Sequence, residues 1–123
     1  MSSEEARILL VDDDPGQLRV RELILRNAGF VTYAVTSAES ALTLLAETPD
    51  TIRVVVTDHI LPGINGAQMV RQLRQQWPNM PVIVLTGLPS VEDEYAGLAV
   101  DILTKPCNPE ELIGLLHSKV GGN

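Results

Sequence analysis

The chain has 123 residues, of which 45% are hydrophobic and 20% charged, and its formal net charge is −7. This length and apolar content exclude a mainly disordered chain and predict one domain over residues 1–123. The acidic balance argues against a nucleic-acid surface, no apolar run reaches the ~20 residues that span a bilayer, and the acidic N-terminus is unlike a signal peptide. We therefore expect a cytoplasmic protein that contacts neither nucleic acid nor membrane.

The first apolar run, residues 6–12, has the length and composition of a fully buried strand. A helix is predicted to follow from Pro15, whose ring suits a first helical turn, to a stop at Gly29. The side chains expected on its buried face are Leu18, Leu23, Ile24, Leu25 and Ala28. A second strand is predicted over residues 30–35.

The next helix is predicted over residues 37–47, because Thr36 and Glu39 have the spacing of a capping box. A third buried strand over residues 52–57 then leads to a helix over 66–77. Arg71 and Arg74, three residues apart on this helix, are expected on a solvated edge.

A fourth strand is predicted over residues 81–85, and Ser90 can cap a fourth helix that Gly97 ends early. Residues 100–103 form the fifth predicted strand, and a last helix is predicted over 108–119. Five strands thus alternate with five helices. This pattern is typical of an α/β domain whose parallel sheet is covered by helices on both faces.

Polar residues stand at the end of four of these strands or within two residues after it. They are Asp12, Asp13, Asp58, Thr86 and Lys105. Because the carboxyl ends of parallel strands lie at one edge of the sheet, we expect these side chains to converge on one pocket. Three carboxylates there would repel one another, and their hard anionic oxygens suit Mg²⁺.

Such a pocket can accept a phosphoryl group. Mg²⁺ would neutralise charge, while the Thr86 hydroxyl and the Lys105 ammonium would hold phosphoryl oxygens. An aspartate nucleophile would then form an acyl phosphate. Chemistry alone does not decide which aspartate attacks. We favour Asp58 because it stands alone, which leaves Asp12 and Asp13 free to bind the metal.

Four segments together resemble the response-regulator receiver domain of two-component signalling. They are VDDD (11–14), TDHILPGING (57–66), VLTG (84–87) and LTKP (103–106). The segments follow the family's order and approximate spacing, and the resemblance covers nearly the whole chain. It implies a flavodoxin-like, doubly wound sheet of five parallel strands in the order 2-1-3-4-5, with five helices.

The resemblance also implies roles for the site residues. Asp58 would take a phosphoryl group from the phosphohistidine of a sensor histidine kinase or a histidine phosphotransfer protein. Mg²⁺ would be bound by Asp13 directly, by Asp12 through a water, by Asp58 and by the backbone carbonyl of Ile60. The domain would catalyse its own phosphorylation and dephosphorylation without being a turnover enzyme.

By the same resemblance, Thr86 and Lys105 would bind the phosphoryl oxygens, and the Lys105–Pro106 peptide would be cis. Ile60 and Leu88 would flank the path of the hydrolytic water, so their apolar side chains predict a long-lived acyl phosphate. Among the neighbours of the site, Asp14 is expected to be a helix cap.

Two departures from the family concern the output. Ile102 stands where receivers commonly carry an aromatic residue on the fifth strand, and the segment between Thr86 and Lys105 is short by about one helical turn. The fourth helix should therefore be short or poorly ordered. We hypothesise that phosphorylation acts mainly by ordering residues 88–94. His59 is expected at the rim of the pocket, where it would shape access.

Two other functions remain open. A small phosphatase of the haloacid-dehalogenase type also uses an aspartyl phosphate, and Asp12 and Asp14 give a D-x-D after the first strand, but Pro15 and Gly16 replace the expected continuation. The other is an interaction module that works without phosphorylation. Neither the downstream partner protein, nor whether the domain is stand-alone or part of a larger protein, follows from the sequence. We expect a monomer or a weak homodimer.

Overall fold

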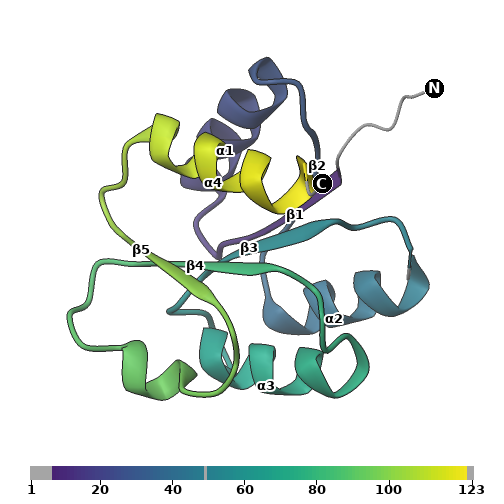
Figure 1. Cartoon of the computed structure of the whole chain (residues 1–123), viewed down its shortest axis with the longest axis vertical. Helices are drawn as coiled ribbons and strands as arrows, with labels where there is room; N and C mark the ends of the chain where they lie inside the picture. The colour runs from purple at the N-terminus through teal and green to yellow at the C-terminus, as the bar shows by residue number, and fades with distance from the viewer. Residues whose placement is uncertain (1–6, 49, 122–123) are drawn as a thin grey trace.

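In a computed structural model that describes residues 7–48 and 50–121, a five-stranded sheet lies between two layers of helices (Figure 1). The strands are β1 (Arg7–Val11), β2 (Val31–Val35), β3 (Val54–Asp58), β4 (Val82–Thr86) and β5 (Asp101–Thr104). The helices are α1 (Pro15–Asn27), α2 (Ala38–Glu47), α3 (Gly66–Gln76) and α4 (Pro109–Gly121), with the 3₁₀ helix η1 (Glu92–Tyr95) between β4 and β5. All neighbouring strands are parallel, in the order β2-β1-β3-β4-β5, which confirms the predicted topology.

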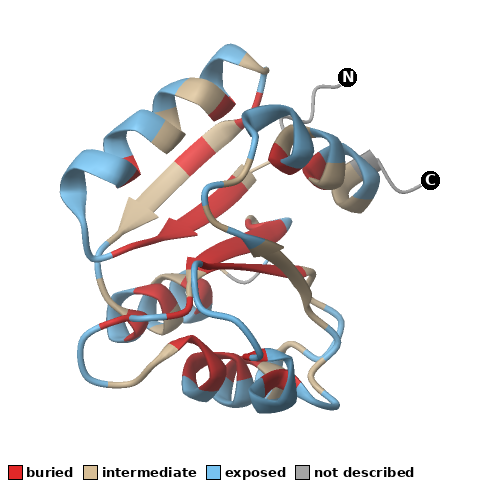
Figure 2. Cartoon of the chain, turned by 90° about the vertical axis from the view of Figure 1, so that its left-hand side faces the viewer, coloured by how far each residue is buried: buried red, intermediate tan, exposed pale blue. Residues whose placement is uncertain are grey.

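Two hydrophobic clusters, one on each face, hold the helices to the sheet. Leu9 and Val55 point toward α2 and α3, whereas Ile8 and Val54 point toward α1 and α4, because successive side chains of a strand face opposite sides. Strand β4 and nearly all of β1 and β3 are buried, and they form the red centre of Figure 2. Long apolar runs without alternation are therefore what these strands require.

Most predicted elements are present, with bounds that differ from the prediction by one or two residues. One prediction for α1 is wrong: Leu23 is 54% exposed, whereas Leu18 and Leu25 are buried. At about 100° per residue, Leu23 lies about 140° around the helix axis from Leu18 and so leaves the buried face. Residue 6 of the first predicted strand lies outside the described residues.

Side-chain caps set the starts of the helices. Asp14 caps α1 as predicted, because its Oδ1 accepts from the Gly16 N–H at 2.9 Å. The predicted Thr36 capping box is wrong by one residue: the hydroxyl of Ser37 accepts from the Ser40 N–H at 3.1 Å. A hydroxyl at the N-cap has to reach the third helical N–H, and α2 begins only at Ala38.

The predicted fourth α-helix is replaced by the single turn η1. Ser90 has a φ of 63°, in the left-handed region, so it does not start a helix, and no side chain caps η1. The described residues thus contain four α-helices instead of five. The expectation of a short fourth helix is confirmed, while its predicted Ser90 cap is wrong.

Arg74 ties the backbone between η1 and β5 to the backbone between α3 and β4. Its guanidinium donates to the carbonyl oxygens of Met80 at 2.6 Å, Leu98 at 2.8 Å, Trp77 at 3.1 Å and Ala99 at 3.2 Å. The predicted solvated edge is therefore wrong for Arg74, whose partial burial lowers the pKa of its guanidinium below its ordinary value. A backbone that leaves the helical pattern needs other donors for its carbonyls.

Within residues 7–48 and 50–121, no helix combines the length and the apolar character needed to cross a membrane.

Candidate functional site

The strand register brings the predicted site residues to one edge of the sheet. Val11 pairs with Thr57, Asp58 pairs with Leu85, and the next residue of β4, Thr86, pairs with Thr104. The polar residues at or directly after the ends of β1, β3, β4 and β5 are consequently neighbours. The predicted convergence is what the observed register requires.

Three carboxylates form an acidic cluster at this edge. Asp12, Asp13 and Asp58 each offer an oxygen, and these oxygens lie within 4.8 Å of one another. Asp12 is only 1% exposed, Asp58 is half-buried and Asp13 is open to solvent. Hard anionic oxygens with an open side for water fit Mg²⁺, so the donor set suits the predicted metal.

Lys105 completes the cluster from the other side. Its Nζ lies 2.8 Å from Oδ1 of Asp58. Its backbone N–H donates to the carbonyl oxygen of Thr86 at 2.7 Å, which fixes the loop after β5 against the end of β4. The Lys105–Pro106 peptide is cis, as the family resemblance implied.

Thr86 is buried at the end of β4, where its Oγ1 accepts from the Leu88 N–H at 3.0 Å. A hydroxyl that accepts one hydrogen bond still has its own proton to donate. Ile60, two residues after Asp58, has a side chain that is 58% exposed. Thr86, Lys105 and the segment that carries the Ile60 carbonyl thus all lie at the end of the sheet that holds the carboxylates.

Sequence reasoning missed Arg21. Its guanidinium lies 3.1 Å from Oδ2 of Asp12, whose Oδ1 accepts from the Asp14 N–H at 3.0 Å. Two cations, Arg21 and Lys105, therefore face three carboxylates, which leaves a formal charge of −1 in this group. No sequence motif indicates a role for Arg21, because its contact with Asp12 depends on how α1 turns the Arg21 side chain toward the end of β1.

His59 is not at the rim of the pocket, so this prediction is wrong. It is 5% exposed, and its Nδ1 lies 2.7 Å from the hydroxyl of Tyr95. Strand alternation points His59 away from the side of Asp58, and the turn η1 brings Tyr95 over it. The only sequence signal was a histidine directly after the predicted nucleophile, which gives no partner.

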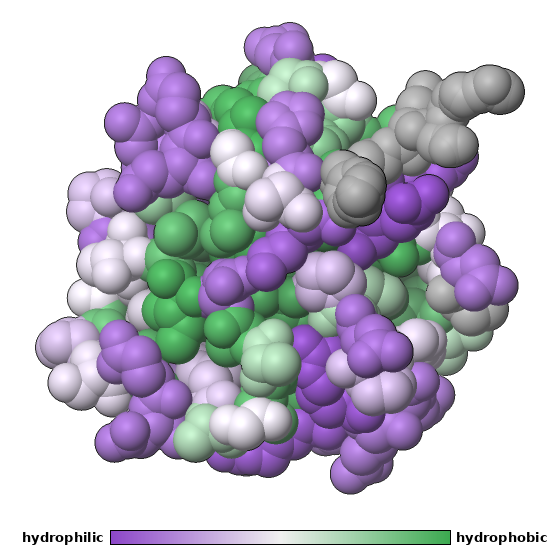
Figure 3. Space-filling model, viewed as in Figure 1, coloured by the Kyte–Doolittle hydropathy of each residue, from purple (hydrophilic) through white to green (hydrophobic). Residues whose placement is uncertain are grey.

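A groove of about 610 Å³ opens beside the cluster, between α1 and the loop after β5. Lys105 lines it together with Val20 and Ile24 of α1. Figure 3 shows a second apolar surface, separate from this groove. On it, hydrophobic side chains gather over β5, between α4 and η1. Strand β5 is an edge strand whose residues are at most half-buried.

A sequence model of the response regulator receiver domain matches residues 8–117. The chain belongs to this family. It is 35% identical over its full length to the DNA-binding response regulator MtrA of Mycolicibacterium smegmatis, and 40% identical over 91% of its length to the response regulator MprA of Mycolicibacterium vanbaalenii. The chain spans about half the length of these relatives, 54% of MtrA and 49% of MprA.

Solved receiver structures have the same fold. A response regulator receiver domain protein from Clostridium thermocellum superposes with a TM-score of 0.88 at 26% identity, covering 94% of each chain. A response regulator receiver protein from Sinorhizobium medicae superposes with a TM-score of 0.85 at 32% identity, covering 98% of each chain. The receiver fold and the two-component family are thereby established for this chain.

Proposed function

We propose that Asp58 is the phosphoacceptor of this receiver domain, and that it takes a phosphoryl group from a phosphohistidine with the help of Mg²⁺. The observation that carries the proposal is the 2.8 Å contact of the Lys105 ammonium with Asp58, beside two further carboxylates within 4.8 Å. A lysine on the nucleophile and a hard-oxygen cluster beside it are the parts that phosphoryl transfer needs.

Asp12, Asp13, Asp58 and the carbonyl of Ile60 would hold the metal, which supplies charge neutralisation for the phosphoryl oxygens when bound. An oxygen of Asp58 attacks phosphorus, and the phosphorus–nitrogen bond of the donor breaks. The electron pair leaves on the imidazole nitrogen of the donor. Lys105 and the free hydroxyl proton of Thr86 hold oxygens of the transferred group, which takes the charge of the Asp58 side chain from −1 to about −2.

Hydrolysis of the acyl phosphate returns the domain to its starting state, so it catalyses its own labelling and loss without turning over a separate substrate. The side chains of Ile60 and Leu88 are 58% and 46% exposed and apolar. They offer no group that would orient an attacking water, and we expect a long-lived phosphoryl group. Its loss within seconds in Mg²⁺ would contradict this expectation.

The test is labelling with acetyl phosphate and Mg²⁺, followed by intact-mass measurement. The wild type should gain one phosphoryl group and Asp58→Ala none. Asp14→Asn is the matched control, because Asp14 is a neighbouring carboxylate that caps α1 outside the cluster. Labelling of Asp58→Ala to the wild-type level would exclude Asp58 as acceptor.

The same assay separates the alternatives. Multiple turnover of a phosphomonoester that is lost in Asp12→Asn would favour the haloacid-dehalogenase-type phosphatase. No labelling and no Mg²⁺ binding would favour an interaction module that works without phosphorylation. Mg²⁺-dependent, stoichiometric labelling at Asp58 favours the receiver function.

For the partners, we propose a sensor histidine kinase or histidine phosphotransfer protein as donor and a downstream protein as the reader. Residues 1–123 would act as one receiver domain, monomeric or weakly dimeric. MtrA is named as DNA-binding, but the net charge of −7 supports a domain that does not itself contact nucleic acid. Retention of the chain on duplex DNA at moderate salt would contradict this part.

A further inference from the structure

The hydrogen bond between His59 and Tyr95 joins two segments that are 36 residues apart in the chain. Both side chains are buried, at 5% and 4% exposure, and the Nδ1 to Oη distance is 2.7 Å. The two rings meet nearly edge to face, with centroids 5.6 Å apart. A contact that is both buried and well directed holds its two segments in one relative position.

One end of this contact belongs to the phosphoacceptor strand. His59 directly follows Asp58, its N–H donates to the Leu85 carbonyl at 3.0 Å, and its own carbonyl accepts from the Gly66 N–H at 2.8 Å. A methyl group on Gly66 would lie 2.6 Å from the Tyr95 hydroxyl and 2.9 Å from the Asp58 carbonyl oxygen. The hydroxyl is therefore packed against Gly66 at the start of α3, which in turn lies close to the end of β3.

The other end belongs to η1. This turn has four residues and no side-chain cap, so tertiary contacts must hold it in place. Besides Tyr95, those contacts include Glu94, whose carboxylate lies 3.7 Å from Nε2 of His59 and whose carbonyl accepts from Arg71 at 3.1 Å. An imidazole with its proton on Nε2 faces Glu94 and accepts from Tyr95 at Nδ1.

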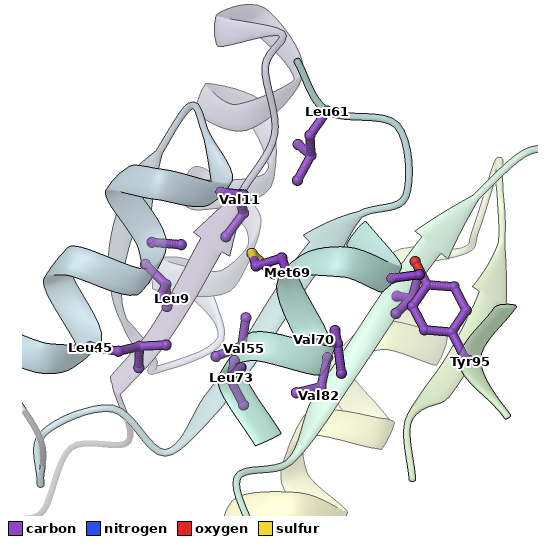
Figure 4. Close-up of a cluster of buried hydrophobic side chains, with 14 of the residues drawn as sticks. Leu9, Val11, Leu45, Val55, Leu61, Met69, Val70, Leu73, Val82 and Tyr95 are labelled. Atoms are coloured by element: carbon purple, nitrogen blue, oxygen red, sulfur yellow. The ribbon is translucent and has the colours of Figure 1, made fainter. Parts of the chain in front are cut away.

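Strand β5 carries no aromatic residue, whereas Tyr95 of η1 is part of the hydrophobic core. The Tyr95 ring lies at one end of the cluster under α2 and α3, across α3 from Leu9 and Leu45 (Figure 4). Ile102 of β5 packs against the same cluster. The aromatic side chain that contacts the residue after Asp58 thus comes from η1, and its hydroxyl lies against His59.

The charge of Asp58 acts on the Tyr95 hydroxyl. Burial, together with the carboxylates of Glu94 and Asp58, raises the pKa of the Tyr95 phenol above its ordinary value of 10. The phenol therefore stays neutral and keeps its proton as a donor. A change of charge at Asp58 consequently changes the environment of this hydrogen bond.

We propose that the His59–Tyr95 hydrogen bond couples phosphorylation of Asp58 to the ordering of η1, and this inference rests on the proposed function. The segment 88–95 is attached to the site at both ends. Leu88 donates to the Thr86 hydroxyl, and Tyr95 bonds to His59. Immobilising Thr86 and the end of β3 around a phosphoryl group orders both attachment points, so the short segment between them is ordered as well.

The test is amide hydrogen exchange of residues 88–95 with Mg²⁺, with and without beryllium fluoride as phosphoryl mimic. In the wild type, the mimic should slow exchange by about three- to tenfold, in line with the strength of one buried hydrogen bond. Tyr95→Phe keeps the ring and removes the hydroxyl, and the slowing should fall below about twofold. His59→Leu removes the other partner and should have the same effect if Tyr95→Phe proves unstable.

Tyr33→Phe is the matched control, since Tyr33 on β2 also loses one hydrogen bond, with Arg7 at 2.8 Å. Its response should equal that of the wild type. Equal slowing in the wild type and in Tyr95→Phe, or no response in the wild type, would overturn the coupling. Acetyl phosphate labelling of each variant is measured in parallel. If the wild type is not labelled, both the proposed function and the coupling are wrong. If Tyr95→Phe is labelled normally but no longer responds to the mimic, the substitution has removed the coupling and not the phosphorylation.

Discussion

The two sides of the site are built differently. On the side of β1 and β3, the carboxylates stand at or directly after the ends of strands that are buried on both faces, and α1 is capped by Asp14. On the side of β4 and β5, the connecting segment is the uncapped turn η1, and β5 is an edge strand that is only half-buried. The nucleophile thus stands on the densely packed side, while the segment that we expect to respond is held by two buried side chains, Val91 and Tyr95, and a few polar contacts.

This difference fits the two tasks of a receiver. Phosphoryl transfer needs the acceptor and its cationic partners held in one geometry. A response needs a segment of low local stability whose arrangement the site can shift. The contrast predicts that equal changes on the two sides have unequal effects.

The largest expected effect is on stability. Leu10→Ala, at a fully buried position of β1, should lower the free energy of unfolding by about 2–5 kcal/mol. Ile102→Ala on β5 removes a half-buried side chain and should cost about 1–2 kcal/mol. Urea unfolding measures both. Equal losses of unfolding free energy in the two variants would contradict the difference in packing between the two sides of the site.

The second-largest effect is expected from removal of the Arg74 guanidinium. Arg74→Ala leaves four carbonyl oxygens without their donor and should cost about 3 kcal/mol, with faster amide exchange over residues 92–99. Arg71→Ala is the control, because Arg71 is exposed and gives one hydrogen bond to this segment. It should cost less than about 1 kcal/mol. A larger loss in Arg71→Ala would show that η1 is held in another way.

Metal binding tests the densely packed side of the site, which β1 and β3 form. If the acidic cluster holds Mg²⁺, a free concentration a hundred times the dissociation constant should stabilise the fold by about 2.7 kcal/mol. Asp13→Asn should reduce this gain, and Asp14→Asn should leave it unchanged, since Asp14 lies outside the cluster. Thermal unfolding with and without Mg²⁺ tests this. An equal gain in Asp13→Asn would place the metal elsewhere.

The smallest expected effect is on pH dependence. Because the pKa of Tyr95 is raised in the folded state, only the unfolded phenol ionises just above pH 10. The contribution of Tyr95 is thus fully present below pH 10 and falls by up to about 1.4 kcal/mol by pH 11. Tyr95→Phe, which cannot ionise, should lose less stability over this range. Identical pH profiles would mean that the phenol ionises equally in both states.

Several parts of the fold and site were predictable because they depend on local patterns. Buried strands read as apolar runs, and polar residues beyond them, such as Asp12 and Lys105, meet at one edge whenever the strands are parallel. Other contacts were not predictable. Arg74 and Tyr95 look like ordinary surface and core residues in the sequence, and their partners are backbone or side-chain atoms from segments that only folding brings close.

The sequence by itself determined the α/β class, the strand order through family resemblance, and the acidic cluster with its lysine, because each depends on strand ends and their spacing. The tertiary structure alone decided that Arg21 pairs with Asp12 and that His59 turns inward to Tyr95. Helix rotation and the path of a short connecting turn set those contacts. Neither leaves a periodic signal in the chain.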